Sequence, residues 1–118
     1  MRVIDFGPDK AKPIGLFDSI AASSILLGDG KGEAHVYCVY LGPGAEIGAH
    51  RAGFGQLFLV VEGRAWAAGE DGKRESLSKW QGAHFVKGEV HSKGSEEGAS
   101  VIMVQIEGLR APGADDAE

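Results

Sequence analysis

Short runs of β-branched and aromatic residues alternate with glycine-rich turns along most of the chain. This pattern is typical of strands joined by tight connections. No segment keeps the apolar spacing of three and four residues that marks an amphipathic helix, although residues 16–27 leave room for one helical turn near Asp18. The sequence therefore predicts a nearly all-β domain. The expected strands are residues 2–6, 23–28, 34–41, 56–62, 64–69, 73–78, 83–87 and 99–107.

Two glycine-containing segments predict hairpins. Asp71 and Gly72 stand between two expected strands in residues 69–73, and glycine accepts the positive φ that a tight turn demands. Residues 28–32, "GDGKG", predict a second hairpin by the same argument.

The strand at residues 56–62 is apolar on both faces. Side chains alternate along a strand, so Phe58 and Val60 share one face with Gln56, while Leu57 and Leu59 lie on the other. A sheet with one solvated face would alternate with polar residues, so both faces are expected to be covered. We expect one face to line a barrel and the other to pack on a second layer or a partner subunit, in a two-fold homodimer.

Length and charge narrow the class of protein. The chain has 118 residues, enough for one domain, which we place at residues 1–109, including an N-terminal arm, with a disordered acidic tail at 110–118. Its net charge is −5 without a basic run, so a nucleic-acid partner is not expected. No apolar window suits a membrane span or a signal peptide, and Cys38 is the only cysteine. These features predict a cytoplasmic protein without membrane contacts.

Two glycine–histidine motifs stand in order along the chain. The first, "GAEIGAHRAGFGQLFLVVEG", contains Gly44, His50, Gln56 and Gly63, and the second, "GEVH", ends at His91. Together they resemble the motifs of the cupin superfamily. The resemblance covers about Ser23 to Leu109 and implies a double-stranded β-helix, a small jelly-roll barrel. The chain departs from the usual pattern at three positions, where Ala52 replaces a histidine, Gln56 a glutamate and Val86 a proline.

The resemblance implies a metal site at His50, Gln56 and His91. Imidazole donors suit zinc, iron and nickel, and manganese is a further candidate, but an amide oxygen is a weaker donor than the usual carboxylate. Glu46 or Glu89 would compensate if either carboxylate pointed inward. The alternative is that the histidines and the glutamine hydrogen-bond one another or water without any metal.

Other residues are candidates for the wall of a pocket in the barrel. Phe58, Val60 and Tyr37 are expected to shape an apolar pocket, and Phe54, between glycines, is a candidate lid. His35 is expected to line the pocket or to fill it, and His84 is either a spare metal ligand in the pocket or an ordinary packing residue. Trp66 and Trp80 are expected to pack.

Three functions remain open. The first is a metal-dependent enzyme of the dioxygenase or isomerase kind, as implied by the resemblance, acting on a small organic molecule. The second is a metal-free module that binds a small molecule without catalysis. The third is a structural dimer with a filled barrel. Retention of a divalent ion separates the first from the second, because one barrel fold hosts many activities.

Overall fold

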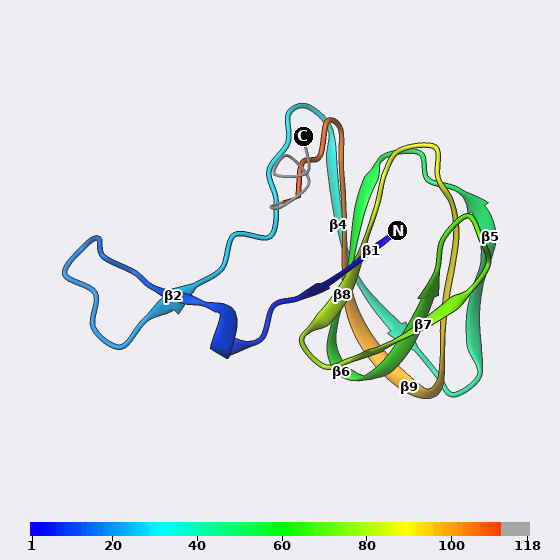
Figure 1. The fold of residues 1–118 in the computed structure, drawn as a ribbon, viewed down its shortest axis with the longest axis horizontal. Coiled ribbons are helices and arrows are strands. Elements are labelled where there is room, and N and C mark those ends of the chain that lie inside the picture. Colours follow the sequence, from blue (N-terminus) through cyan, green and yellow to red (C-terminus); the bar gives the residue numbers. More distant parts are fainter. Residues whose placement is uncertain (112–118) are drawn as a thin grey trace.

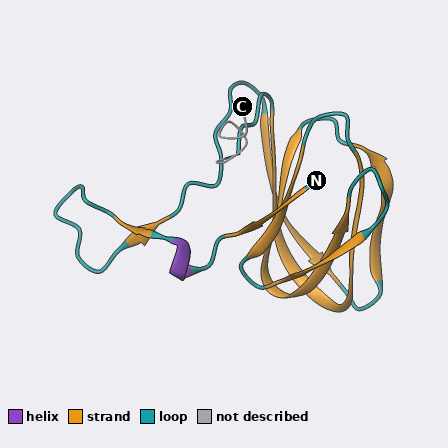
Figure 2. Cartoon of the chain, in the orientation of Figure 1, coloured by secondary structure: helices purple, strands orange, loops and turns teal. Residues whose placement is uncertain are grey.

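The computed structural model describes residues 1–111 and consists almost entirely of strands (Figures 1 and 2). One short 3₁₀ turn, η1 (Pro8–Lys10), is the only helical segment among the described residues. The strands are β1 (Arg2–Asp5), β2 (Lys12–Pro13), β3 (Ser23–Ser24), β4 (Ala34–Leu41), β5 (Ala45–Arg51), β6 (Gly55–Ala68), β7 (Arg74–Ser78), β8 (Gln81–Phe85) and β9 (Val90–Ile106).

Two long antiparallel strands, β6 and β9, form the spine of the barrel. The first half of β6 and the second half of β9 belong to one layer, and the other two halves belong to a second layer that faces it across the core. The first layer has the strand order β1-β8-β6-β9-β4. In the second layer β5 pairs with the first half of β9, and β7 pairs with the second half of β6. The all-β barrel expected from the sequence is confirmed.

The bend that joins the two layers is built around Gly63. The β6–β9 pairing shifts register on both sides of this residue, between Val60 and Glu62 and again between Arg64 and Trp66. Gly63 has φ +79°, and a Cβ there would lie 2.9 Å from the Cα of Ala99 and closer still to the Gly98 carbonyl oxygen. Only glycine fits this close crossing of two backbones without strain.

Apolar side chains form two separate clusters. The larger cluster fills the barrel, between the layers. It consists of Leu41, Phe58, Val60, Ala65, Ala67, Leu77, Ala83, Phe85 and Val101. The smaller cluster covers part of the outer face of the first layer, and its buried members are Leu57, Leu59 and Ala111. The two faces assigned to residues 56–60 are therefore both covered, as expected.

Several predicted elements differ from the structure. Residues 56–62 and 64–69 are one bent strand, β6, while β5 and the first half of β9 were not predicted. The hairpin at residues 69–73 is confirmed, with the Asp71 carboxylate accepting a hydrogen bond from the Lys73 amide at 2.9 Å. Residues 28–32 form no hairpin, because Asp29 bridges to Arg110 instead. The expected helical turn is absent, since Phe17 and Asp18 have positive φ.

An arm formed by residues 11–24 extends from the barrel, and its two short strands, β2 and β3, pair only with each other (Figure 1). At the other end of the chain, Arg110 pairs with Asp29 and Ala111 is buried, whereas residues 112–118 of the predicted tail lie outside the described residues. Within residues 1–111 no helix has the length and apolar character needed to span a membrane.

Candidate functional site

Among the buried polar side chains of the barrel are Gln56 on β6, and His91 and Lys93 on β9. They are 2%, 1% and 1% exposed, respectively. Alternation along the strands points these side chains inward. Gln56 lies on the same face of β6 as Phe58, and Lys93 lies opposite Ala67. Phe58 and Ala67 both belong to the interior cluster. We call these three residues the polar centre.

The ring of Phe85 links the members of the polar centre. Phe85 is the strand partner of Gln56. Its ring centroid lies 4.4 Å from that of His91, and 5.7 Å from the Lys93 Nζ atom. The Lys93 Nζ also lies 5.6 Å from the Phe58 ring and 3.7 Å from the Met103 sulfur. An amine is thus held among aromatic rings and a thioether, which solvate a cation far less well than water.

This environment shifts both titratable groups toward their neutral forms. Burial lowers the pKa of Lys93 to about 8. Burial, together with the positive charges of Lys93 and His50, lowers the pKa of His91 to about 4. At neutral pH the centre therefore contains a neutral imidazole and a mostly protonated amine.

The polar centre also has hydrogen-bonding capacity to spare. Both ring nitrogens of His91 and the Nε2 atom of Gln56 are buried without a hydrogen-bond partner. Buried polar groups in folded proteins are usually paired, and leaving one unpaired is costly. A hydrogen-bond acceptor would satisfy the unpaired amide or imidazole donors, and an anion would offset the charge of the ammonium group.

His50 lies at the surface above the polar centre. It pairs with His91 across the β5–β9 ladder, and the two ring centroids are 4.6 Å apart. The His50 side chain is exposed, and its Nδ1 donates a hydrogen bond to the Gly48 carbonyl oxygen at 2.8 Å. The structure thus brings the two predicted histidines together, with Gln56 in the same barrel.

The predicted pocket residues divide into two groups. Phe58 and Val60 are fully buried inside the barrel. Tyr37 is 45% exposed, and His35 lies beside Phe54, with ring centroids 5.6 Å apart. His35 is hydrogen-bonded to the Glu33 carboxylate at 2.5 Å, so its ring already has a partner near the surface.

His84 does not share the barrel interior with these residues. It pairs with Arg2 on one side and Leu57 on the other, and Leu57 belongs to the outer cluster. Its neighbours Ala83 and Phe85 point inward, so alternation sends His84 outward. Burial first, and then the charge of Arg2, lower the pKa of His84.

The donor set fits a divalent metal poorly. No group of three or more histidine, cysteine, aspartate or glutamate side chains is placed to hold a metal within residues 1–111. The two carboxylates that were expected to compensate are engaged elsewhere: Glu46 lies 3.7 Å from Arg74, and Glu89 contacts the Met1 amino group and accepts a hydrogen bond from the Val86 amide. The Lys93 ammonium adds a positive charge where a cation would sit.

Sequence reasoning missed Lys93. The residue stands in "HSKGSEEG", a polar segment that resembles a solvated loop. In the structure this segment is the first half of β9, where Lys93 is sandwiched between β5 and β6. The available signal was the alternation of His91, Lys93 and Ser95, all of which are buried.

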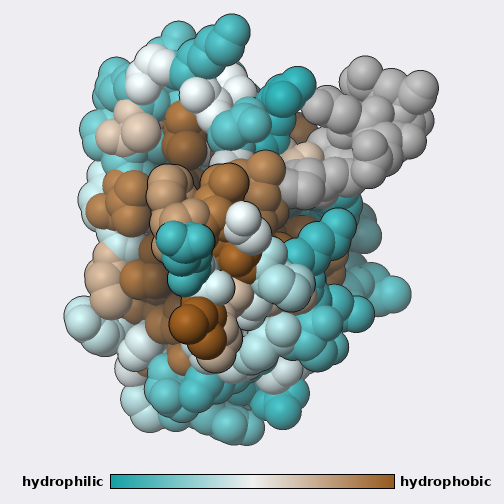
Figure 3. Space-filling view, turned by 90° about the vertical axis from the view of Figure 1, so that its left-hand side faces the viewer, coloured by the Kyte–Doolittle hydropathy of each residue, from teal (hydrophilic) through white to brown (hydrophobic). Residues whose placement is uncertain are grey.

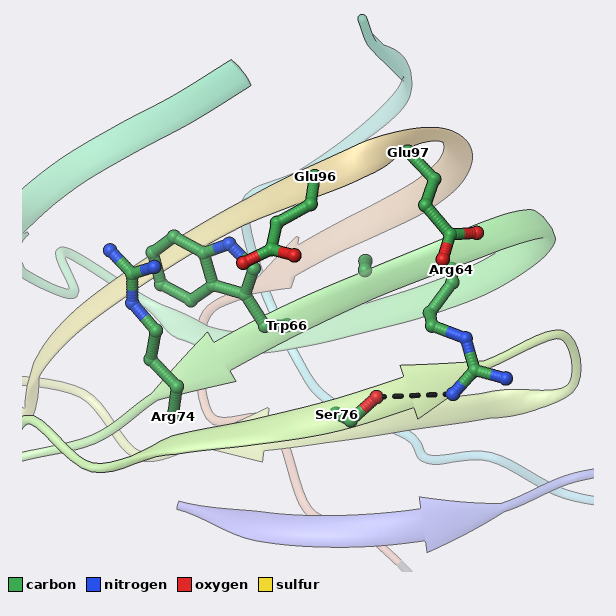
Figure 4. A pocket seen from close by; sticks show the side chains of 7 residues that line it. Arg64, Trp66, Arg74, Ser76, Glu96 and Glu97 are labelled. Carbon is green, nitrogen blue, oxygen red and sulfur yellow. Dashed lines mark hydrogen bonds between the residues drawn. The ribbon is translucent and has the colours of Figure 1, made fainter. Parts of the chain in front are cut away.

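A separate cleft of about 250 Å³ lies on the outer face of the second layer (Figure 4). Its two arginines have partners within the chain. The Arg74 guanidinium lies 3.7 Å above the Trp66 ring, and Arg64 donates a hydrogen bond to the Ser76 hydroxyl at 3.3 Å. Trp66 in turn lies flat on Gly94, where a Cβ would come within 2.5 Å of the indole. These contacts support packing of Trp66, as the sequence predicted.

Solved structures with this architecture are small barrels. A cupin superfamily protein from Desulfitobacterium hafniense aligns with a TM-score of 0.59 and 13% identity, over 91% of this chain and 99% of that one. An uncharacterized conserved protein with a double-stranded beta-helix domain from Klebsiella pneumoniae aligns with a TM-score of 0.56 and 23% identity, over 90% and 86%. A cupin-2 domain containing protein from Shewanella frigidimarina gives 0.55 and 18%, over 78% and 86%.

At these identities the likeness concerns the fold. No protein-family model matches the sequence, and no curated protein matches it. The chain is therefore a small protein with the cupin, double-stranded β-helix fold, which confirms the architecture that its two motifs predicted.

Proposed function

We propose that the protein is a small-molecule-binding cupin-fold module that takes an organic anion, such as a carboxylate, at Gln56, His91 and Lys93. Binding requires no metal. The observation that carries this proposal is the set of unpartnered buried groups around a buried ammonium. A carboxylate accepts several hydrogen bonds and neutralises one positive charge, so it meets both needs of the polar centre.

The surroundings favour an anion with an apolar body. Phe58 and Phe85 flank the Lys93 amine, and Val60 and Val101 are also fully buried in the same cluster. Binding sites for small molecules commonly combine such walls with a few convergent polar groups. Aromatic and short aliphatic monocarboxylates are therefore the class of ligand that we propose.

The test is calorimetric titration with benzoate and short-chain carboxylates, each compared with its neutral amide. Lys93→Met removes the charge and keeps the side-chain volume, while Lys87→Met makes the same change at an exposed position. We expect the carboxylates to bind more tightly than the amides, and Lys93→Met to weaken carboxylate binding by at least about tenfold. Lys87→Met should bind like the unmodified protein.

Two results would contradict this proposal. One is equal affinity for a carboxylate and its amide, which would mean that charge plays no part. The other is metal binding: zinc or nickel retained by the protein and lost in His50→Ala, with no carboxylate binding. That second result would favour the metal-dependent enzyme instead.

A further inference from the structure

The arm carries large apolar side chains into solvent. Phe17 is 91% exposed, Ile20 is 89% exposed and Leu16 is 64% exposed. All three lie in the loop between β2 and β3, at the end of the arm that points away from the barrel (Figure 1). Apolar side chains are exposed singly on many proteins, but a group of them at the tip of a projection indicates a contact with another surface.

The arm has little support from its own chain. Its ladder consists of two residue pairs, and a two-stranded hairpin is marginally stable in water even when it is longer. Phe17, Asp18 and Ala21 have φ values of +61°, +52° and +56°. A bulky residue with positive φ costs free energy, so such a conformation persists where surrounding contacts hold it.

One half of the outer face of the first layer is left uncovered. Over β6, this face is closed by Phe6, Leu27 and Leu109, which pack against Leu57 and Leu59. Over β4, by contrast, Val36 is 68% exposed and Tyr40 is 77% exposed, with Cys38 also exposed between them. Figure 3 looks at the molecule from the side to which the arm extends, so that the arm points toward the viewer, and apolar residues gather in the middle of this view.

Alternation places these three side chains on the same face as the partly buried Ile102 and Val104. Cys38 pairs with Ile102, and Val36 pairs with Val104. None of these five residues is charged. We call this surface the β4 face.

We infer that the β4 face is the docking site for the arm of a second copy of this chain, in a dimer that exchanges arms. The arm points away from its own barrel, so it is free to reach a neighbouring molecule. Between Ile14 and Ser24 the arm has a single charged residue, Asp18, which matches an uncharged β4 face.

A two-fold axis makes this contact self-complementary. Each copy contributes one arm and one β4 face, so a single pair of molecules satisfies both surfaces and the assembly closes. A partner that uses charge for recognition finds nothing to pair with on the β4 face. The inference is independent of what binds in the polar centre.

The first test is the mass of the protein in solution, measured by sedimentation equilibrium over a range of concentrations. We expect a dimer for the unmodified chain. The double variant Phe17→Asp, Ile20→Asp should have a dimer dissociation constant at least about tenfold higher, because large buried apolar side chains dominate such contacts. Tyr40→Asp, on the receiving face, should act in the same way. Val86→Asp introduces the same charge at a 58% exposed valine away from both surfaces and should leave the dimer intact.

A disulfide then tests exchange itself. Ile20→Cys is combined with Cys38→Ser, and this chain is mixed with the unmodified chain, which has Cys38 as its only cysteine. Any disulfide between the two different chains joins an arm to the β4 face of another molecule. We expect this mixed disulfide to form under mild oxidation, and Val86→Cys with Cys38→Ser to give none.

The circular dichroism spectrum of each variant establishes that its barrel is folded. A monomer at every concentration overturns the inference, whether the arm folds back or meets another kind of partner. A dimer that is unaffected by the arm and β4-face substitutions, without the mixed disulfide, overturns it as well.

Discussion

Lys93 is a buried group that opposes stability and that the proposed anion site would use. Its ammonium is buried among Phe58, Phe85 and Met103, and the pKa of about 8 lies well below the ordinary value of 10.5. Below pH 8 the folded protein keeps the charge in an apolar place, at a cost of roughly 3 kcal/mol. Natural sites often retain such unfavourable groups because binding depends on them.

This cost makes a direct prediction for Lys93→Met. The substitution should raise the free energy of unfolding at neutral pH by up to roughly 3 kcal/mol, because it removes the buried charge and keeps the volume. The stability of the unmodified protein should rise between about pH 8 and pH 10.5, where the unfolded chain still binds the proton that the folded chain has lost. Urea unfolding across this range checks both points. A less stable Lys93→Met variant would contradict the account of Lys93.

His91 predicts a pH dependence of the same sign in a more acidic window, because its pKa is also lowered in the folded protein. Its pKa falls from 6.5 to about 4 in the folded protein, so the unfolded chain takes up a proton first as the solution is acidified. Stability should therefore be lost as pH falls through this window, with about 2 kcal/mol lost between pH 7 and pH 5. His91→Leu should lack this contribution. Subtracting its unfolding free energies from those of the unmodified protein isolates the effect of His91, and an unchanged difference between the two pH values would contradict it.

The residue scale also shows where sequence reasoning succeeds. His50 and His91 were paired on the strength of two motifs, and the folded chain does place them side by side. Lys93 and the outward direction of His84 depend on which strands pair and in what register. Neighbouring residues in the sequence do not reveal such partners. Alternation shows which residues share a face of a strand, but which of the two faces points inward depends on how that strand pairs.

At the scale of elements, the bend at Gly63 determines which residues of β6 point into the barrel. Before the bend, Gln56, Phe58 and Val60 point into the barrel; after it, Ala65 and Ala67 do so, and the parity has changed. The register shifts beside Gly63 absorb the difference. The irregularity beside Gly63 interrupts the inward–outward alternation of side chains without ending the strand. The alternation in the sequence therefore predicted two short strands, at residues 56–62 and 64–69, where the structure has one.

Gly63→Ala should therefore be strongly destabilising. The new Cβ would collide with the backbone at Gly98 and Ala99, and alanine disfavours φ +79°. We expect a loss of at least about 2 kcal/mol in the free energy of unfolding. Gly42→Ala is the matched control, because a Cβ at Gly42 meets nothing within 4 Å. Equal stability of the two variants in urea would rule out the close crossing as the reason for glycine.

The whole molecule combines a two-layered barrel, filled by apolar side chains, with an uncovered apolar surface. The sequence predicted cover for both faces of its apolar strands, and the chain itself supplies that cover over β6 but not over β4. An N-terminal arm was expected as part of the domain, but its form was not: residues 23–28 were assigned to a strand and the segment near Asp18 to a helical turn, whereas the arm has only two strands of two residues each. What such residues pack against is a property of the assembly, and local patterns carry no information about it.

An arm-exchanged dimer links folding to association, which gives the last prediction. If the folded state is a dimer, mass action should raise the melting temperature with protein concentration, by about 3 °C for each tenfold increase in a chain of this length. At concentrations where sedimentation shows the Phe17→Asp, Ile20→Asp variant to be monomeric, its melting temperature should not depend on concentration, and Val86→Asp should behave like the unmodified protein. Scanning calorimetry at several concentrations makes the measurement. A melting temperature independent of concentration in the unmodified protein would mean that each barrel is stable without its neighbour, and that the exposed residues of the arm add nothing to the folded state.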